Sequence, residues 1–199
     1  MYELPTTITI NNTVHSIRNQ GDFRMVLGCF AILQDEEFTQ QERVISALML
    51  FYEGIEELED LEKLGDLEEA VHQMALFFNC GKDDDQGAKS SYKLLDWDKD
   101  EMLIISAVNN VAKKEIRLEP YVHWWTFMAY YMAVGESSLS TVVGIRNKIA
   151  NGKKLENYER DFKKNNPQYF NWDMRNTETR ELDKQLRELW NQNSERRCT

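Results

Sequence analysis

Hydrophobic residues recur every three or four positions over most of the chain. Because an α-helix turns once in about 3.6 residues, this spacing places them on one face of a helix. Core-facing stripes of this kind cover 23–33, 44–51, 67–78 and 102–111, and further helices are predicted over 138–149 and 155–162. The pattern predicts a mainly α fold, a multi-helix bundle.

The first residues follow a different pattern. Leu4–Ile10 and Thr13–Ile17 are short runs rich in β-branched residues, and Asn11 and Asn12 between them tolerate the positive φ of a two-residue turn. We therefore expect a small N-terminal β-hairpin. Because an isolated hairpin is marginally stable, it should lie on the helices or offer an edge to another chain.

Capping residues mark several helix boundaries. A polar side chain at a helix start accepts a hydrogen bond from a backbone N–H, and an acidic residue three positions later can return one. The helix starts with these signals are Asp22, Thr39 with Glu42, Asp66 with Glu69, and Asp98 with Glu101. Gly81 is expected to follow the end of the helix over 67–78.

The most unusual segment is His123-Trp124-Trp125-Thr126-Phe127. Pro120 fits the first turn of a helix, so this segment is predicted to be helical, with Gly135 after its end. Neighbouring residues point about 100° apart on a helix, so one tryptophan can fill the core while the other reaches a neighbouring helix or a peptide groove. Core packing alone is the other interpretation. Met128 and Met132 would give such a groove an adaptable surface.

Polarity divides the chain into three predicted parts. Residues 1–20 form the hairpin, residues 21–152 a helical core domain, and residues 153–199 a charged C-terminal helical arm. Residues 81–91 are polar and have no apolar period, which predicts a mobile loop within the core domain.

The C-terminal arm carries a candidate contact. A helix is predicted over 176–192, and its narrow apolar stripe includes Leu186 and Trp190. A stripe of this width suits docking on a partner or on the body of the fold.

Charge is unevenly distributed. The chain has 34 acidic and 24 basic residues and a formal net charge of -10, which repels phosphate and anionic lipid, so neither nucleic acid nor a membrane is an expected partner. Residues 35–69 hold thirteen acidic residues and two basic ones, whereas residues 146–199 hold thirteen basic and nine acidic ones. Ends of opposite sign allow identical chains to pack head to tail into a ring or spiral, although solvated helix faces explain the same pattern.

The sequence offers little for catalysis. His15, His72 and His123 fall in different predicted elements, and the familiar hydrolase, nucleotide and dinucleotide motifs are absent. The run Asp96 to Asp100 imitates a calcium loop but lacks the glycine and the bidentate glutamate that such a loop needs. Three cysteines at long spacings favour a reducing compartment over a disulfide framework. We expect no enzymatic activity, no cofactor and no metal.

Several motifs together resemble one family. They are Leu4-Pro5 followed by the hairpin, Asp22-Phe23-Arg24, the stretch YKLLDWD from Tyr92 to Asp98, His123-Trp124-Trp125 with Phe127, and Ile145-Arg146. Over residues 4–150 the chain is similar to the gene product fifteen family of tail-module proteins of Gram-positive siphophages, which are encoded beside the tape measure protein. The chain departs from the family at Ile116-Arg117-Leu118, where members carry an acidic residue.

The resemblance implies a tail assembly chaperone in the host cell cytoplasm. It would keep the apolar, helical tape measure protein soluble until tail tube protein subunits polymerise around it, and it would be absent from the mature virion. The client or self-association surface is expected to draw on Trp124, Trp125, Phe127, Met128, Leu186 and Trp190. The alternatives are a stable structural component of the tail or connector, and an enzyme, which would need carboxylates or histidines clustered in the folded protein.

Overall fold

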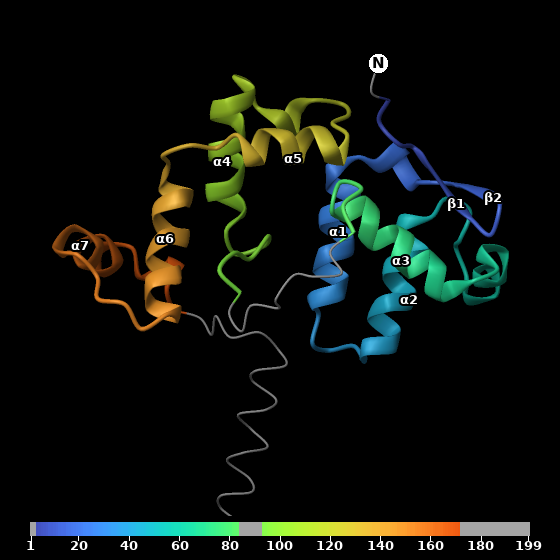
Figure 1. Cartoon of the computed structure of the whole chain (residues 1–199), viewed down its shortest axis with the longest axis horizontal. Helices are drawn as coiled ribbons and strands as arrows, with labels where there is room; N and C mark the ends of the chain where they lie inside the picture. Colours follow the sequence, from blue (N-terminus) through green and yellow to red (C-terminus); the bar gives the residue numbers. More distant parts are fainter. Residues whose placement is uncertain (1–2, 84–92, 172–199) are drawn as a thin grey trace, which may run out of the picture. The chain divides into compact units, whose positions relative to one another are not determined.

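The computed structural model describes residues 3–83 and 93–171, which form two compact units (Figure 1). The first unit contains residues 3–83 and 101–137, and the second contains residues 93–100 and 138–171. The fold is mainly helical with a small N-terminal hairpin, as predicted. The hairpin packs with the first helices, and the helix from residue 138 belongs to the second unit; the division into 1–20, 21–152 and 153–199 stays a prediction.

The hairpin consists of β1 (Thr7–Ile10) and β2 (Thr13–Ser16), which pair antiparallel with Ile10 opposite Thr13. Asn11 and Asn12 take φ values of 47° and 66°, the left-handed conformation expected for this turn. Every second residue of β1 is buried, and the strand contacts helix α3. The hairpin is therefore stabilised by packing of the buried side chains of β1 on the first unit.

Two helices, α1 (Phe23–Gln34) and α2 (Gln40–Phe51), lie side by side in the first unit (Figure 1). Asp22 caps α1 by accepting the backbone N–H of Arg24, 2.9 Å from its carboxylate. Thr39 begins α2 with the predicted capping box. Both helix starts are thus fixed by local hydrogen bonds, as the sequence predicts.

A short 3-10 helix, η2 (Leu58–Leu64), precedes α3 (Leu67–Phe78). The sequence pattern did not predict η2, which is too short to show a helical period. Asp66 caps α3, and the chain reverses after its end, where the N–H of Gly81 donates to the carbonyl of Leu76 at 2.7 Å. The predicted loop 81–91 falls largely on residues 84–92, which lie outside the described residues.

The first unit is completed by α4 (Glu101–Ala112), the 3-10 helix η3 (Ile116–Leu118) and α5 (Trp124–Met132). The prediction that Pro120 begins the last helix is wrong. Extended backbone runs up to His123 instead, because Val122 pairs with the start of α1: its carbonyl accepts the N–H of Phe23, and its N–H donates to Asp22, both at 2.9 Å.

Aromatic rings fill the core of the first unit. Phe23 stacks on Phe127 with ring centroids 4.7 Å apart, and Phe51 meets the rings of Phe77 and Phe78 edge to face at 5.4 and 5.6 Å. Such contacts add to the stabilisation from buried area. These contacts join α1 to α5 and α2 to α3, and Phe30 on α1, 4.9 Å from Phe78 on α3, links the two pairs into one core.

The second unit comprises residues 93–100, α6 (Ser138–Ala150), α7 (Asn157–Asn165) and the 3-10 helix η4 (Pro167–Tyr169). Lys148 on α6 pairs with Glu159 on α7, with 2.7 Å between the ammonium nitrogen and a carboxylate oxygen. The two helices are therefore joined by an ion pair.

Arg146 is the centre of the second unit. Its side chain is fully buried and forms two hydrogen bonds with the equally buried Asp100, at 2.5 and 2.9 Å. It also donates to the carbonyl oxygens of Leu94 at 3.1 Å and Tyr169 at 2.6 Å. One guanidinium thus links α6 to the segment before α4 and to the chain after α7.

Asp96 organises the turn of residues 97–100 directly before α4. Its carboxylate accepts the N–H groups of Asp98 and Lys99 at 3.1 and 3.0 Å and pairs with Lys93 at 2.9 Å. Burial raises the pKa of this carboxyl, but the bonds from Lys99 and Lys93 outweigh burial and lower it to about 2. The acidic run Asp96 to Asp100 therefore serves a turn and a buried ion pair.

Candidate functional site

The start of α5 is fixed by the imidazole of His123. Its Nδ1 accepts the backbone N–H of Trp125 at 3.0 Å, so Nε2 carries the proton of the neutral ring and donates to the carbonyl of Pro5 at 3.0 Å. Burial lowers the pKa of His123, against the opposing effects of the Pro5 carbonyl and of Asp22. A neutral imidazole therefore caps the helix and fastens the N-terminal segment beside it.

Asp22 and Arg24 tie the start of α1 to the chain before α5. The guanidinium of Arg24 pairs with the Asp22 carboxylate at 2.9 Å, and its other nitrogen donates to the carbonyls of Ile116, Arg117 and Glu119 at 3.2, 3.1 and 2.7 Å. Asp22 is buried. The motif Asp22-Phe23-Arg24 thus combines a helix cap, a core ring and a clamp on the extended segment.

The two tryptophans cap the end of α3. The indole N–H of Trp124 donates to the carbonyl of Phe78 and that of Trp125 to the carbonyl of Phe77, each at 2.9 Å. The last carbonyls of a helix have no partner within it, so the bond from Trp124 satisfies the Phe78 carbonyl, while the Phe77 carbonyl accepts the backbone N–H of Cys80 as well as the indole of Trp125. This contact explains why two neighbouring positions both carry tryptophan.

Gly21 allows the close approach of this site to the turn before α1. Its φ is 76°, and a Cβ atom there would lie 2.6 Å from the ring of Phe77 and 3.2 Å from the imidazole of His123. Asn19 and Gln20 before it also have positive φ values, 50° and 53°. A sharp left-handed turn therefore brings α1 against α3 and α5.

The two faces of α5 have different roles. Trp124 and Phe127 are 1% and 0% exposed, so the side chains of these two predicted contact residues support the helix from the core. Trp125, Met128, Ala129 and Met132 lie at spacings i, i+3, i+4 and i+7 and are half-buried or exposed; we call them the α5 stripe. Met132 is 63% exposed. Trp125 packs partly on Phe77 of α3, whereas Met128, Ala129 and Met132 leave apolar surface on this face half-buried or exposed.

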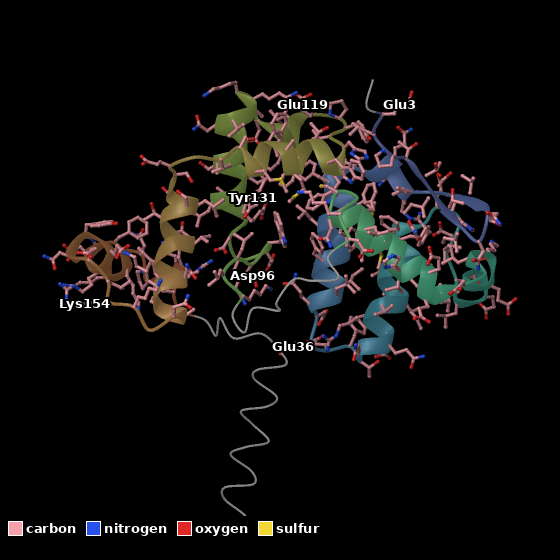
Figure 2. The ribbon with its side chains drawn as sticks, viewed as in Figure 1. Glu3, Glu36, Asp96, Glu119, Tyr131 and Lys154 are labelled. Carbon is pink, nitrogen blue, oxygen red and sulfur yellow. The ribbon has the colours of Figure 1, made fainter. Side chains whose placement is uncertain are left out.

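An open hollow of about 570 Å³ lies beside the extended segment before α5. Leu118 and Tyr121 on its border are exposed, while the charged groups on its wall are paired: Arg24 with Asp22, and Arg117 with Glu115. Figure 2 labels Glu119 here and Tyr131 on α5. The sequence did not indicate that Leu118 is exposed, because a three-residue helix has no readable period.

The two described cysteines are not activated as nucleophiles. Burial raises the pKa of Cys29 to about 12 and also raises that of Cys80, which keeps both thiols protonated. The described residues contain no group of three or more metal-ligating side chains and no helix long and apolar enough to cross a membrane. Leu186 and Trp190, also predicted contact residues, lie outside the described residues.

Helix α5 is thus held by the His123 cap and by the tryptophan bonds to α3, and Met128, Ala129 and Met132 on it are half-buried or exposed. The sequence profile of a family described as "Bacteriophage Gp15 protein" matches residues 1–170. The chain belongs to this family, which makes it a phage structural or assembly protein. No curated protein and no solved structure matches it.

Proposed function

We propose that this protein is a tail assembly chaperone that binds apolar helical segments of the tape measure protein through the α5 stripe. The α5 stripe carries the proposal, because its spacing is the one by which two helices pack along their apolar faces. Methionines suit a surface that must accept a varied client, since their side chains are unbranched and adaptable.

The rigidity of the helix supports this role. His123, Asp22 and the tryptophan bonds to α3 hold α5 in place, so a client helix meets a preformed surface and little ordering is needed on binding. A stripe of four residues gives only weak binding. Several copies bound along one client would together cover its apolar surface, and tube subunits could still displace each copy in turn.

Net charge suits the same task. At -10 the protein repels other copies of the complex, which keeps a coated client dispersed. The proposed setting is the host cell cytoplasm, with tail tube protein replacing the chaperone during assembly and the chaperone absent from the mature virion.

Co-expression with the tape measure protein tests the proposal. The full chain should raise the soluble fraction of the client, and Met128→Gln combined with Met132→Gln should remove most of this effect, because amides are costly to bury against an apolar client. Met102→Gln is the matched control: Met102 is 66% exposed on α4, outside the stripe. A client that stays insoluble beside the wild-type chain, or equal effects of both substitutions, would contradict the proposal.

The other candidate role is a structural part of the tail or connector. Mass spectrometry of purified virions separates the two, because a chaperone should be missing whereas a structural part should be present in fixed copy number. Presence in the particle would favour the structural role.

A further inference from the structure

A hollow of about 360 Å³ lies beside α7 in the second unit. Leu155, Pro167 and Phe170 form its apolar wall, and Phe170 is buried. These three side chains come from the segment before α7 and from η4 and its end, so the hollow is built by the packing of α7 on its flanking chain. Its apolar wall can accept an aliphatic side chain.

Basic residues surround this hollow: Arg160, Lys163 and Lys164. None of them forms an ion pair with a described carboxylate; Arg160 donates to an asparagine amide. Lys148 on α6 is different, since Glu159 neutralises it. The border of the hollow therefore holds positive charge that is open to a partner.

The 3-10 helix η2 in the first unit has the opposite character. Leu58 is 61% exposed and stands between Glu57 and Glu59, with Glu62 following one turn later. Glu59 and Glu62 are exposed, and neither pairs with a described cation. An exposed leucine among carboxylates is the chemical complement of an apolar hollow bordered by cations.

We infer that η2 of one copy docks into the α7 hollow of a second copy of this chain. Leu58 enters the hollow and packs on Phe170, while Glu59 and Glu62 lie against Lys163 and Lys164. Because the two surfaces differ, the contact is heterologous and propagates head to tail into a ring or a spiral. The inference goes beyond the proposed function, since it needs no client and leaves the α5 stripe free.

The balance of forces sets how this contact behaves. Exposed ion pairs are weak, and salt screens them: the screening length is about 8 Å at physiological ionic strength. The apolar contact of Leu58 is not screened by salt. Self-association should therefore be weak, dependent on protein concentration, and stronger at low salt.

Analytical ultracentrifugation of the full-length protein tests the inference. At about 0.05 M salt the weight-average mass of the wild type should rise with concentration, and about 0.5 M salt should reduce the rise. Lys163→Glu with Lys164→Glu should weaken association by about tenfold or more, and Glu59→Lys with Glu62→Lys should do the same.

Mixing the two double variants is the decisive step. In each double variant alone, η2 and the hollow carry charges of the same sign and repel. In the mixture, the acidic η2 of the lysine-to-glutamate variant fits the basic hollow of the glutamate-to-lysine variant. The basic η2 of the latter likewise fits the acidic hollow of the former. An equimolar mixture should therefore regain association. Lys153→Glu with Lys154→Glu is the matched control, because these exposed lysines make the same charge change outside the lining of the hollow; Lys154 is labelled in Figure 2.

Leu58→Ser provides a variant without a charge change. Because Leu58 is exposed, thermal melting should match the wild type, whereas association should be weaker at both salt concentrations. A wild type that stays monomeric at low salt, or a mixture that does not regain association, would overturn the inference. If the wild type is monomeric and its charge variants sediment as more extended monomers, the contact forms within one chain. This result also rejects docking between two copies.

Discussion

The indole N–H of Trp124 lies 2.9 Å from the carbonyl oxygen of Phe78, the last residue of α3. Trp125 makes the equivalent bond to Phe77, but that carbonyl also accepts the N–H of Cys80. The two bonds therefore differ in consequence. Losing the first leaves a buried carbonyl without its indole donor, whereas losing the second leaves a carbonyl that keeps a backbone partner.

Replacing each tryptophan by phenylalanine exposes this difference. Trp124→Phe should lower the free energy of unfolding by about 1–3 kcal/mol beyond the effect of lost ring area, because it removes the side-chain donor to the Phe78 carbonyl. Trp125→Phe should cost less than about 1 kcal/mol, since it is half-buried and Phe77 keeps the Cys80 bond. Urea unfolding of both variants measures the gap, and equal losses would contradict this account.

Trp124→Ala should be more severe, because it also opens a cavity among the core rings. We expect a loss of about 3–5 kcal/mol. Trp125→Ala should leave the chain folded, so that light scattering can report any effect on association or client binding. A similar loss of stability in both variants, with no effect on assembly, would remove Trp125 from the proposed contact surface.

Replacing Gly21 by alanine should destabilise the protein more than replacing Gly54. Both have a positive φ, 76° and 78°, but a Cβ at Gly21 would lie 2.6 Å from the Phe77 ring, whereas Gly54 has open space around it. Gly54→Ala should cost about 1 kcal/mol from backbone strain alone. Gly21→Ala should cost clearly more in the same chemical unfolding experiment. Equal costs would mean that the ring of Phe77 moves aside freely.

These features also show what the sequence could predict. The capping bonds of Asp22 and Thr39 and the turn at Asn11-Asn12 involve residues two or three positions away, so these roles follow from local spacing, whereas the bond from Val122 to Asp22 does not. The tryptophan bonds to α3 span 46 and 48 positions, and nothing local indicates which carbonyls they meet. The sequence therefore marked His123-Trp124-Trp125 as unusual without revealing what it holds.

The misplaced helix start before α5 has the same origin. Pro120 has the local chemistry of a first turn, but Val122 hydrogen bonds to Phe23 and Asp22, about a hundred positions earlier, and these bonds keep the segment extended. The predicted division of the chain into three parts also rested on a local property, the polarity along the sequence. Arg146 gave no sign that it would join Asp100, so the place of α6 in the second unit could not be predicted.

The pKa of His123 predicts a pH dependence. In the unfolded chain the ring titrates near its ordinary value of about 6.5, and in the folded protein burial lowers this value. Between the two values the unfolded chain binds more protons, so stability falls as pH falls; above about 6.5 the contribution of the neutral ring is fully present. Protonation of Nδ1 would also remove the cap on Trp125.

Unfolding free energies at about pH 7.5 and pH 5.5 measure this effect. His123→Asn should reduce the loss on acidification, because the amide can still cap α5 but does not titrate. His72→Asn is the control, since His72 is exposed on α3 and should leave the pH dependence unchanged. An unaltered dependence in His123→Asn would assign the effect to other groups.

Arg146 and Asp100 predict a strongly coupled double mutant. Arg146→Met should lower the free energy of unfolding by about 3–5 kcal/mol, because it leaves the carboxylate of Asp100 buried without its countercharge. Asp100→Asn should be similarly harmful, since it strands a buried guanidinium. Adding Asp100→Asn to Arg146→Met removes the stranded charge, so the double variant should be more stable than the sum of the single losses implies, by about 1–3 kcal/mol. Chemical unfolding of the four proteins gives this coupling, and strict additivity would show that the pair does not act as a unit.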